Sequence, residues 1–208
     1  MAIVADVRCR QDAKIMARTS VPRNDPGTTI VSLKVTLRGT KPPVWRRLLV
    51  PGTMTLGGLH RAIGAAMGWH DTHLHLFEID GRDYGDPHTV DDVADENRLT
   101  LNGVLKSGVA RFAYTYDFGD NWEHTVAVEK TQPAAEGDAY PLCVAGKRNC
   151  PPEDCGGPWG YRHLLEVLAD PTNPDYAEQS EWVGEEFSPD AFDIDTANAV
   201  LNARFKPK

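Results

Sequence analysis

The sequence predicts one α+β domain: a β-grasp-like strand, strand, helix, strand start, an added aromatic hairpin, and a C-terminal helical segment packed on the sheet. Two observations predict it. Apolar and polar side chains alternate in residues 30–37 and 112–128, whereas apolar side chains recur at helical spacing in residues 55–68 and beyond Pro141. We expect residues 1–28 to be a disordered or frayed lead-in. Residues 29–206 would then form the domain, with 29–132 mainly β and 140–206 mainly helical.

Local signals define the first four elements. The segment TIVSLKVTLRG predicts a strand, and VWRRLLVP, after the turn KPP, predicts its hairpin partner. The segment TLGGLHRAIGAAMGW predicts a helix that Thr55 caps and Gly68 ends. THLHLFEID predicts the next strand, and the acidic residues 81–105 fit a loop or a short helix. This order of strand, strand, helix and strand resembles the start of a β-grasp fold, although a split unit of another α+β fold fits equally well.

An aromatic hairpin and three helices complete the prediction. In RFAYTYDFGDNWEHTVAVEKT, aromatic side chains occupy every second position from 112 to 118, so we expect them on one strand face. The residues GDN supply the turn. Helical stripes then predict helices between Pro158 and Asp170, around 176–183 and over 195–205.

The formal net charge of −8 is unevenly distributed. Residues 1–50 carry 10 basic and 3 acidic side chains, whereas residues 151–208 carry 4 and 12. The basic end is either a solvated tail or a surface that attracts nucleic acid or an acidic partner, while the acidic body argues against wrapping duplex DNA. The candidate nucleic-acid contacts are Lys34, Arg38, Lys41, Arg46 and Arg47.

The sequence also indicates a compartment. Charge or glycine interrupts every apolar run, so no segment approaches the roughly 20 residues that a membrane span needs. The first residues carry charges where a secretory signal needs an apolar core. We therefore expect a cytoplasmic protein without a membrane partner, in which the four cysteines are reduced thiols or metal ligands.

A candidate binding cleft lies between the aromatic hairpin and a connector rich in proline and glycine, CVAGKRNCPPEDCGGPWGY. Acidic and aromatic side chains cluster in both segments, although turn hydrogen bonds and a partly buried histidine would explain the hairpin residues equally well. The candidates are Asp117, Asp120, Trp122, Glu123 and His124 from the hairpin, and Glu153, Asp154, Trp159 and Tyr161 from the connector and the helix after it.

Two further patterns are candidates for metal binding. His73 and His75 would share one strand face, where two imidazoles can converge on one ion, or they form a half-buried pair beside Phe77. Cys143, Cys150 and Cys155 lack the closer spacing of most structural zinc sites. The prolines and glycines favour a stiff connector there, and zinc is the alternative.

Several motifs together resemble one family. WRRLLVP, AAMGWHDTHLHLFEI, YTYDFGDNWEHTVAVEK, RNCPPEDCGGPWGYRHLLEVLADP and EEFSPDAFD are similar to the plasmid pRiA4b ORF-3-like family, over about Ile30 to Asn202. Some members are labelled passenger proteins of insertion-sequence elements. The resemblance implies an α+β fold with a β-grasp-like portion and a link to plasmid or insertion-sequence biology, but no reaction, cofactor or catalytic residue.

Three hypotheses about function follow. The first is a soluble, non-enzymatic binding or adaptor module with a protein or nucleic-acid partner. The second is a metal-dependent hydrolase or nuclease that uses His73, His75, Asp117, Asp120 and His124. The third is a structural zinc site on the cysteine segment. No cofactor is established by the sequence, and zinc or another divalent metal is the candidate.

Overall fold

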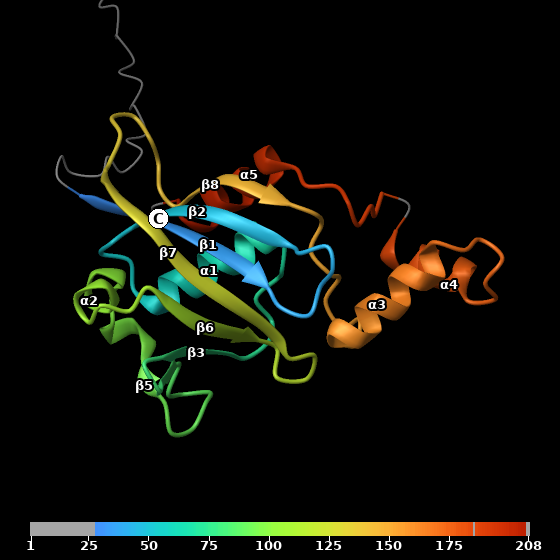
Figure 1. Cartoon of the computed structure of the whole chain (residues 1–208), viewed down its shortest axis with the longest axis horizontal. Helices are drawn as coiled ribbons and strands as arrows, with labels where there is room; N and C mark the ends of the chain where they lie inside the picture. The colour runs from blue at the N-terminus through green and yellow to red at the C-terminus, as the bar shows by residue number, and fades with distance from the viewer. Residues whose placement is uncertain (1–27, 185, 207–208) are drawn as a thin grey trace, which may run out of the picture.

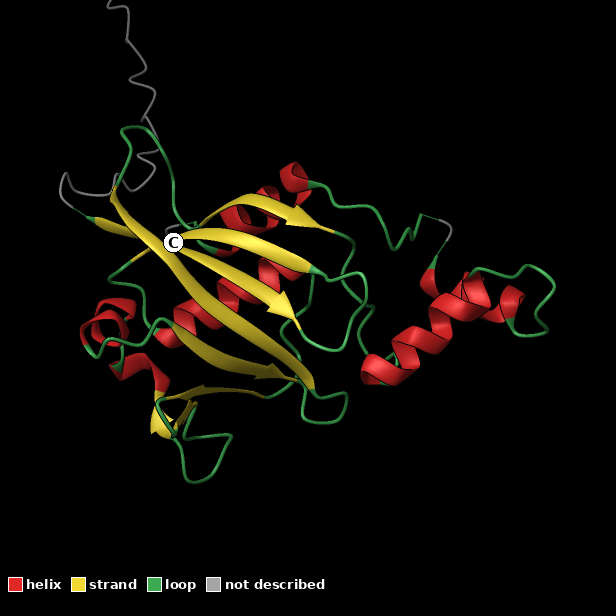
Figure 2. Ribbon diagram, in the orientation of Figure 1, coloured by secondary structure: helices red, strands yellow, loops and turns green. Residues whose placement is uncertain are grey.

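The computed structural model describes residues 28–184 and 186–206, so the predicted lead-in and Cys9 lie almost wholly outside the described residues. It is an α+β fold built on one eight-stranded sheet in the order β5-β4-β3-β6-β7-β1-β2-β8 (Figures 1 and 2). The strands are β1 (Thr29–Leu37), β2 (Trp45–Pro51), β3 (His75–Ile79), β4 (Arg82–Gly85), β5 (Ala94–Asp95), β6 (Arg111–Tyr116), β7 (Trp122–Pro133) and β8 (Leu142–Lys147). The sheet is mixed, because β4 and β5 are parallel whereas the other pairs are antiparallel.

Helices follow the strands in two groups. The first group holds α1 (Leu56–Met67), a 3-10 turn η1 (Glu96–Arg98) and α2 (Leu101–Lys106). The second holds α3 (Gly157–Leu168), α4 (Tyr176–Val183) and α5 (Ile194–Arg204). None of the helices in the described part of the chain is long and apolar enough to cross a membrane.

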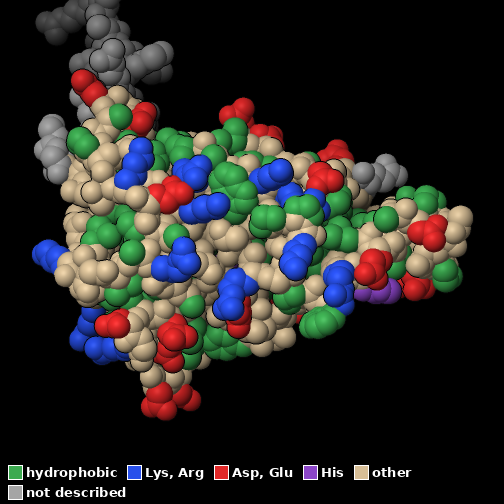
Figure 3. All heavy atoms as spheres, viewed as in Figure 1, with side chains coloured by type: hydrophobic (Ala, Val, Ile, Leu, Met, Phe, Trp, Pro, Cys, Tyr) green, Lys and Arg blue, Asp and Glu red, His purple; other side chains and the backbone are tan. Residues whose placement is uncertain are grey.

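The core lies between α1 and one face of the sheet (Figure 1). Every α1 residue except Arg61 is buried. The prediction of this helix is confirmed at both ends: the Thr55 side chain accepts a hydrogen bond from the Gly58 N–H, and Gly68 ends the helix at φ 98°. In the view of Figure 1 the strands lie in front of α1, and Figure 3 shows charged side chains of both signs spread over this front surface.

The C-terminal helices take two different positions. Helix α5 packs beside α1 and β8, whereas α3 and α4 pack on each other and lie beside the end of the sheet (Figure 1). Helix α4 buries none of its residues, whereas α3 buries four. The helical prediction beyond Pro141 is therefore confirmed for three helices, of which α5 has the clearer packing against the sheet.

Three local expectations need correction. Residues 142–147, assigned to the connector or the helical half, form the edge strand β8 beside β2. Residues 81–105 contain two short strands as well as helical turns. Phe118 does not join the inner aromatic face: it is 46% exposed, because Asp117 has φ 58° and turns the chain at the end of β6.

Candidate functional site

Three loops meet at one end of the sheet and form what we call the three-loop junction. They are residues 68–74 after α1, the turn 117–121 between β6 and β7, and residues 148–156, the part of the connector between β8 and α3. Hydrogen bonds donated by backbone N–H groups hold them together. The Asp117 N–H donates to the Leu74 carbonyl at 2.8 Å, and the Gly156 N–H donates to Asp120 Oδ2 at 3.2 Å. The junction therefore brings together acidic residues that the sequence placed in separate segments.

A histidine and two carboxylates lie close together at this junction. His73 Nδ1 is 3.5 Å from Asp117 Oδ2, and His73 Nε2 is 3.5 Å from Asp154 Oδ1. Of all His, Cys, Asp and Glu side chains in the residues described, these three alone form a group of at least three ligand atoms within 4.8 Å of one another. The structure thus joins one residue of each predicted set: the metal pair, the hairpin and the connector.

A second polar cluster adjoins the first. The Tyr116 hydroxyl donates to Glu153 Oε1 at 2.6 Å, while the His70 ring and backbone N–H both contact Glu153 Oε2. Partial burial disfavours the charged form of Glu153, but these hydrogen bonds outweigh it and hold its pKa below the ordinary value. Burial and this same carboxylate raise the pKa of Tyr116 to about 12. Glu153 is therefore an ionised acceptor that ties the connector to the loop after α1.

An acidic pocket of about 540 Å³ opens beside Asp154, between the connector and the α3–α4 pair. Three of its wall residues are acidic, and no lysine or arginine is among them. Trp182, also in the wall, is 49% exposed. The lining comprises Asp154, Cys155, Gly160, His163, Leu164, Glu178, Gln179, Glu181 and Trp182.

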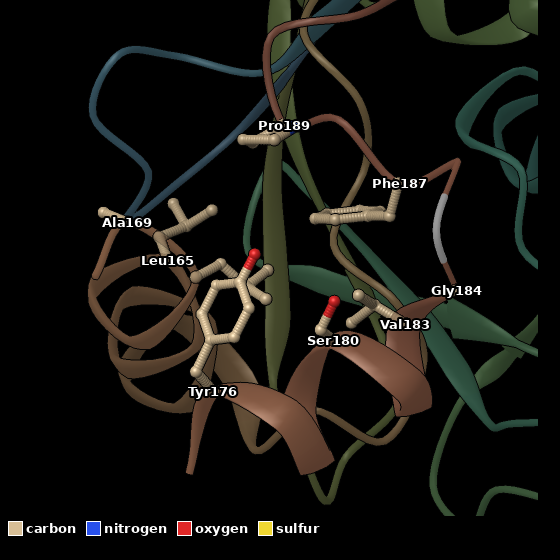
Figure 4. Close-up of a pocket in the computed structure, with 9 residues that line it drawn as sticks. Leu165, Ala169, Tyr176, Ser180, Val183, Gly184, Phe187 and Pro189 are labelled. Carbon is tan, nitrogen blue, oxygen red and sulfur yellow. The ribbon is translucent and has the colours of Figure 1, made fainter. Parts of the chain in front are cut away.

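A smaller pocket of about 270 Å³ uses another face of α3 and α4 (Figure 4). Figure 4 shows Leu165 of α3 and Ala169, which follows that helix, facing Val183 of α4, with Phe187 and Pro189 from the segment after α4. Most of its lining residues have apolar side chains, and none is Asp, Glu, Lys or Arg. The two pockets differ in charge, and only the acidic one contains a predicted cleft residue, Asp154.

Several predicted cleft residues lie away from the junction surface. Trp122, His124 and Tyr161 belong to the buried core. Burial lowers the pKa of His124 to about 4. Glu123 forms an ion pair with Arg38 at 2.8 Å, and Trp159 is 73% exposed with the Arg162 guanidinium over its ring. The predicted cleft residues that lie at the junction are therefore Asp117, which is buried there, and Asp120, Glu153 and Asp154.

His75 does not join His73. Strand β3 begins at His75, whose ring stacks on that of His60 at 3.4 Å and whose Nε2 lies 2.7 Å from Glu96. His60 also contacts Tyr114 and Asp71. The sequence analysis missed His60 and His70. The available signal for a buried His60 was its position directly after Leu59 in the helix that covers the core.

The three cysteines do not gather either. Cys143 and Cys150 are buried and Cys155 is half-buried, all three are free thiols, and they belong to no group of potential metal ligands in the described residues. Burial raises the pKa of each thiol, to about 12 for Cys155. This placement favours the connector interpretation over a shared ion.

The low thiolate content of these cysteines gives a prediction. In a Cys9→Ser variant, we expect native protein to react with a thiol reagent at least tenfold more slowly than urea-unfolded protein, because only accessible thiolates are nucleophilic. Absorbance of the released chromophore measures both rates. Fast reaction of all three thiols in the native state would contradict the packing described.

The predicted nucleic-acid residues have different surroundings. Arg46 needs correction as a contact: it is 2% exposed, and its guanidinium donates to the carbonyls of Ala66, Trp45 and Lys147. Arg47 makes two hydrogen bonds to Glu129, and these raise the pKa of Arg47. With Arg46 buried and Arg38 paired to Glu123, Lys34 and Lys41 are the members of the set that are neither buried nor in an ion pair among the described residues.

Comparisons with known proteins identify the family. Residues 29–196 match the model described as plasmid pRiA4b ORF-3-like protein. The chain is 43% identical over 159 residues to the uncharacterized protein y4hQ of Sinorhizobium fredii (strain NBRC 101917 / NGR234), covering 75% of this chain and 81% of that one. A crystal structure of the protein of unknown function MM3350 from Methanosarcina mazei Go1 shares 40% identity at a TM-score of 0.77, covering 81% of this chain and 97% of that one. The chain therefore belongs to the plasmid pRiA4b ORF-3-like family.

Proposed function

We propose that this protein is a binding or adaptor module that captures a lysine- or arginine-bearing segment of a protein partner in the acidic pocket beside the three-loop junction. The observation that carries the proposal is the composition of the pocket wall. Asp154, Glu178 and Glu181 line a space of about 540 Å³, and no lysine or arginine is among the lining residues to compensate their charge. A pocket of this size accommodates a long cationic side chain.

The exposed indole of Trp182 supports the same ligand class. An ammonium or guanidinium group placed over an indole face is attracted by the ring quadrupole, by about 0.5–2 kcal/mol depending on desolvation. Carboxylates beside such a ring add charge-assisted hydrogen bonds. An aromatic ring and three acids in one wall thus match a basic side chain better than an anionic or wholly apolar ligand.

Peptide binding tests this proposal. We expect a ten-residue peptide rich in lysine and arginine to bind in fluorescence anisotropy, with affinity that falls as salt rises. A peptide with glutamine at every basic position should not bind. Glu178→Gln/Glu181→Gln should weaken binding at least tenfold, because both carboxylates line the pocket.

Two matched controls separate the pocket from general charge. Glu136→Gln/Asp138→Asn removes two carboxylates from the exposed β7–β8 loop and should leave affinity within twofold of the wild type. Trp182→Ala should weaken binding, whereas Trp159→Ala removes an even more exposed tryptophan outside the pocket and should not. Equal losses in both double variants would overturn the proposal.

The other hypotheses have less support. The hydrolase set of His73, His75, Asp117, Asp120 and His124 is dispersed, since His75 and His124 face the core between α1 and the sheet. A nucleic-acid surface would rest mainly on Lys34 and Lys41. We retain as part of the proposal a single domain over residues 29–206, a cytoplasmic location and the link to plasmid or insertion-sequence biology.

A further inference from the structure

We propose that a ring nitrogen of His73 and one carboxylate oxygen each from Asp117 and Asp154 bind a divalent transition-metal ion at the three-loop junction. The three ligand atoms lie within 4.8 Å of one another. His73 Nδ1 is 3.5 Å from Asp117 Oδ2 and His73 Nε2 is 3.5 Å from Asp154 Oδ1, so either ring nitrogen already lies 3.5 Å from one carboxylate. Ligands bonded to one ion at about 2.0–2.2 Å stand roughly 3–3.5 Å apart in tetrahedral or octahedral geometry. Small side-chain rotations therefore suffice to close the site.

The Asp117 carboxylate is fixed in an orientation that suits such an ion. Its Oδ1 accepts hydrogen bonds from the Gly119 and Asp120 N–H groups, which fixes the carboxylate in the turn. Its Oδ2 accepts no hydrogen bond in the described residues and faces His73, although the side chain is only 10% exposed. A carboxylate in a side chain this little exposed is stabilised when a cation approaches its free oxygen.

The other two ligands come from segments that are tied to the same turn. The ring of His73 packs edge-on against Tyr116 at 5.7 Å, and the Leu74 carbonyl accepts from the Asp117 N–H. Asp154 lies in the connector that Asp120 holds through the Gly156 N–H. The Asp154 side chain is 75% exposed, so its carboxylate has room to rotate towards the ion and complete the site.

The donor set indicates the class of ion. One imidazole with two carboxylates suits Zn²⁺ or Mn²⁺, whereas Ca²⁺ and Mg²⁺ prefer all-oxygen sites. Three protein ligands leave at least one coordination position for water or for a group of a bound partner. This site is separate from the peptide proposal, because only Asp154 belongs to both the metal ligands and the acidic pocket.

Manganese titration tests the inference. We would purify the full chain without a polyhistidine tag, strip it with a chelator, and follow the free Mn²⁺ signal by electron paramagnetic resonance. Mn²⁺ is chosen because it favours nitrogen and oxygen over thiolate ligands, which excludes the cysteines. We expect one ion per chain, with affinity at least tenfold weaker in His73→Ala and in Asp117→Asn.

Further variants guard against misfolding. Asp154→Asn keeps a residue that tolerates the left-handed backbone and alters an exposed side chain, so its weaker binding cannot come from unfolding. His88→Ala and Asp138→Asn remove an exposed histidine and an exposed acid elsewhere and should bind Mn²⁺ like the wild type. Absence of one-to-one binding, or unchanged affinity in all three ligand variants, would overturn the site. Neither result would affect the peptide test, which uses Glu178 and Glu181.

Discussion

Replacing Gly157 with alanine is expected to lower the free energy of unfolding by about 2–4 kcal/mol, which is a large effect for one methyl group. Gly157 begins α3 at φ 66°, where a side chain is strained. Its added Cβ would also overlap the carbonyl oxygen of Asp120 and lie 3.2 Å from the carbonyl carbon. Because both partners are backbone, either the connector or the β6–β7 turn must move.

Chemical denaturation measures this loss, and Gly81→Ala is its matched control. Gly81 has φ 72° but open space where the Cβ would stand, so its substitution carries the backbone strain without the overlap. We expect Gly81→Ala to cost about 1 kcal/mol. Equal losses of unfolding free energy in the two variants would show that Gly157 is not in close contact with the β6–β7 turn. A larger loss for Gly157→Ala should come with weaker Mn²⁺ binding, because the close approach of Gly157 to the Asp120 carbonyl positions Asp154 near Asp117.

Acidification from pH 7 to pH 4 is expected to destabilise the fold by several kcal/mol. Burial and the neighbouring His75 lower the pKa of His60 to about 4, and burial lowers the pKa of His124 to about 4. Unfolded histidines take up protons near pH 6.5, so the unfolded chain binds more protons throughout this window. Stability is therefore fully present above pH 6.5 and is lost as pH falls, by roughly 3 kcal/mol for each histidine.

Urea unfolding at pH 7, 6, 5 and 4 measures this dependence. His124→Leu removes one titrating ring from a fully buried position and should flatten the slope between pH 6.5 and 4, whatever its stability at pH 7. Comparing slopes avoids confusion with the cost of losing the hydrogen bond to the Tyr114 carbonyl. His88→Ala removes an exposed histidine as a control. A slope unchanged by His124→Leu would contradict neutral burial of this ring.

Elements that depend on local signals were predictable from the sequence. The cap at Thr55, the stop at Gly68 and the GDN turn act through neighbouring residues, and the structure contains all three. The alternation in WRRLLVP also indicates which of its two arginines is buried. Arg46 shares its strand face with Leu48 and Val50, which predicts the buried position that the structure gives it.

The site was less predictable because it depends on three separate loops. His73 and His75 are two positions apart, but β3 begins only at His75, so strand alternation does not apply to the pair. Asp117 and Asp154 are brought together by contacts of Asp120 with the connector, and no local pattern records that contact. The sequence could identify the acidic segments but not their meeting point.

Asp154 stands in both the metal-ligand group and the acidic pocket wall. An ion bound to its carboxylate would neutralise part of the charge that attracts a basic segment, and a basic side chain bound there would compete for the same oxygen. Such thermodynamic linkage is reciprocal, so the metal must weaken the peptide by the same factor as the peptide weakens the metal. Metal availability would thereby regulate how firmly this protein holds its partner.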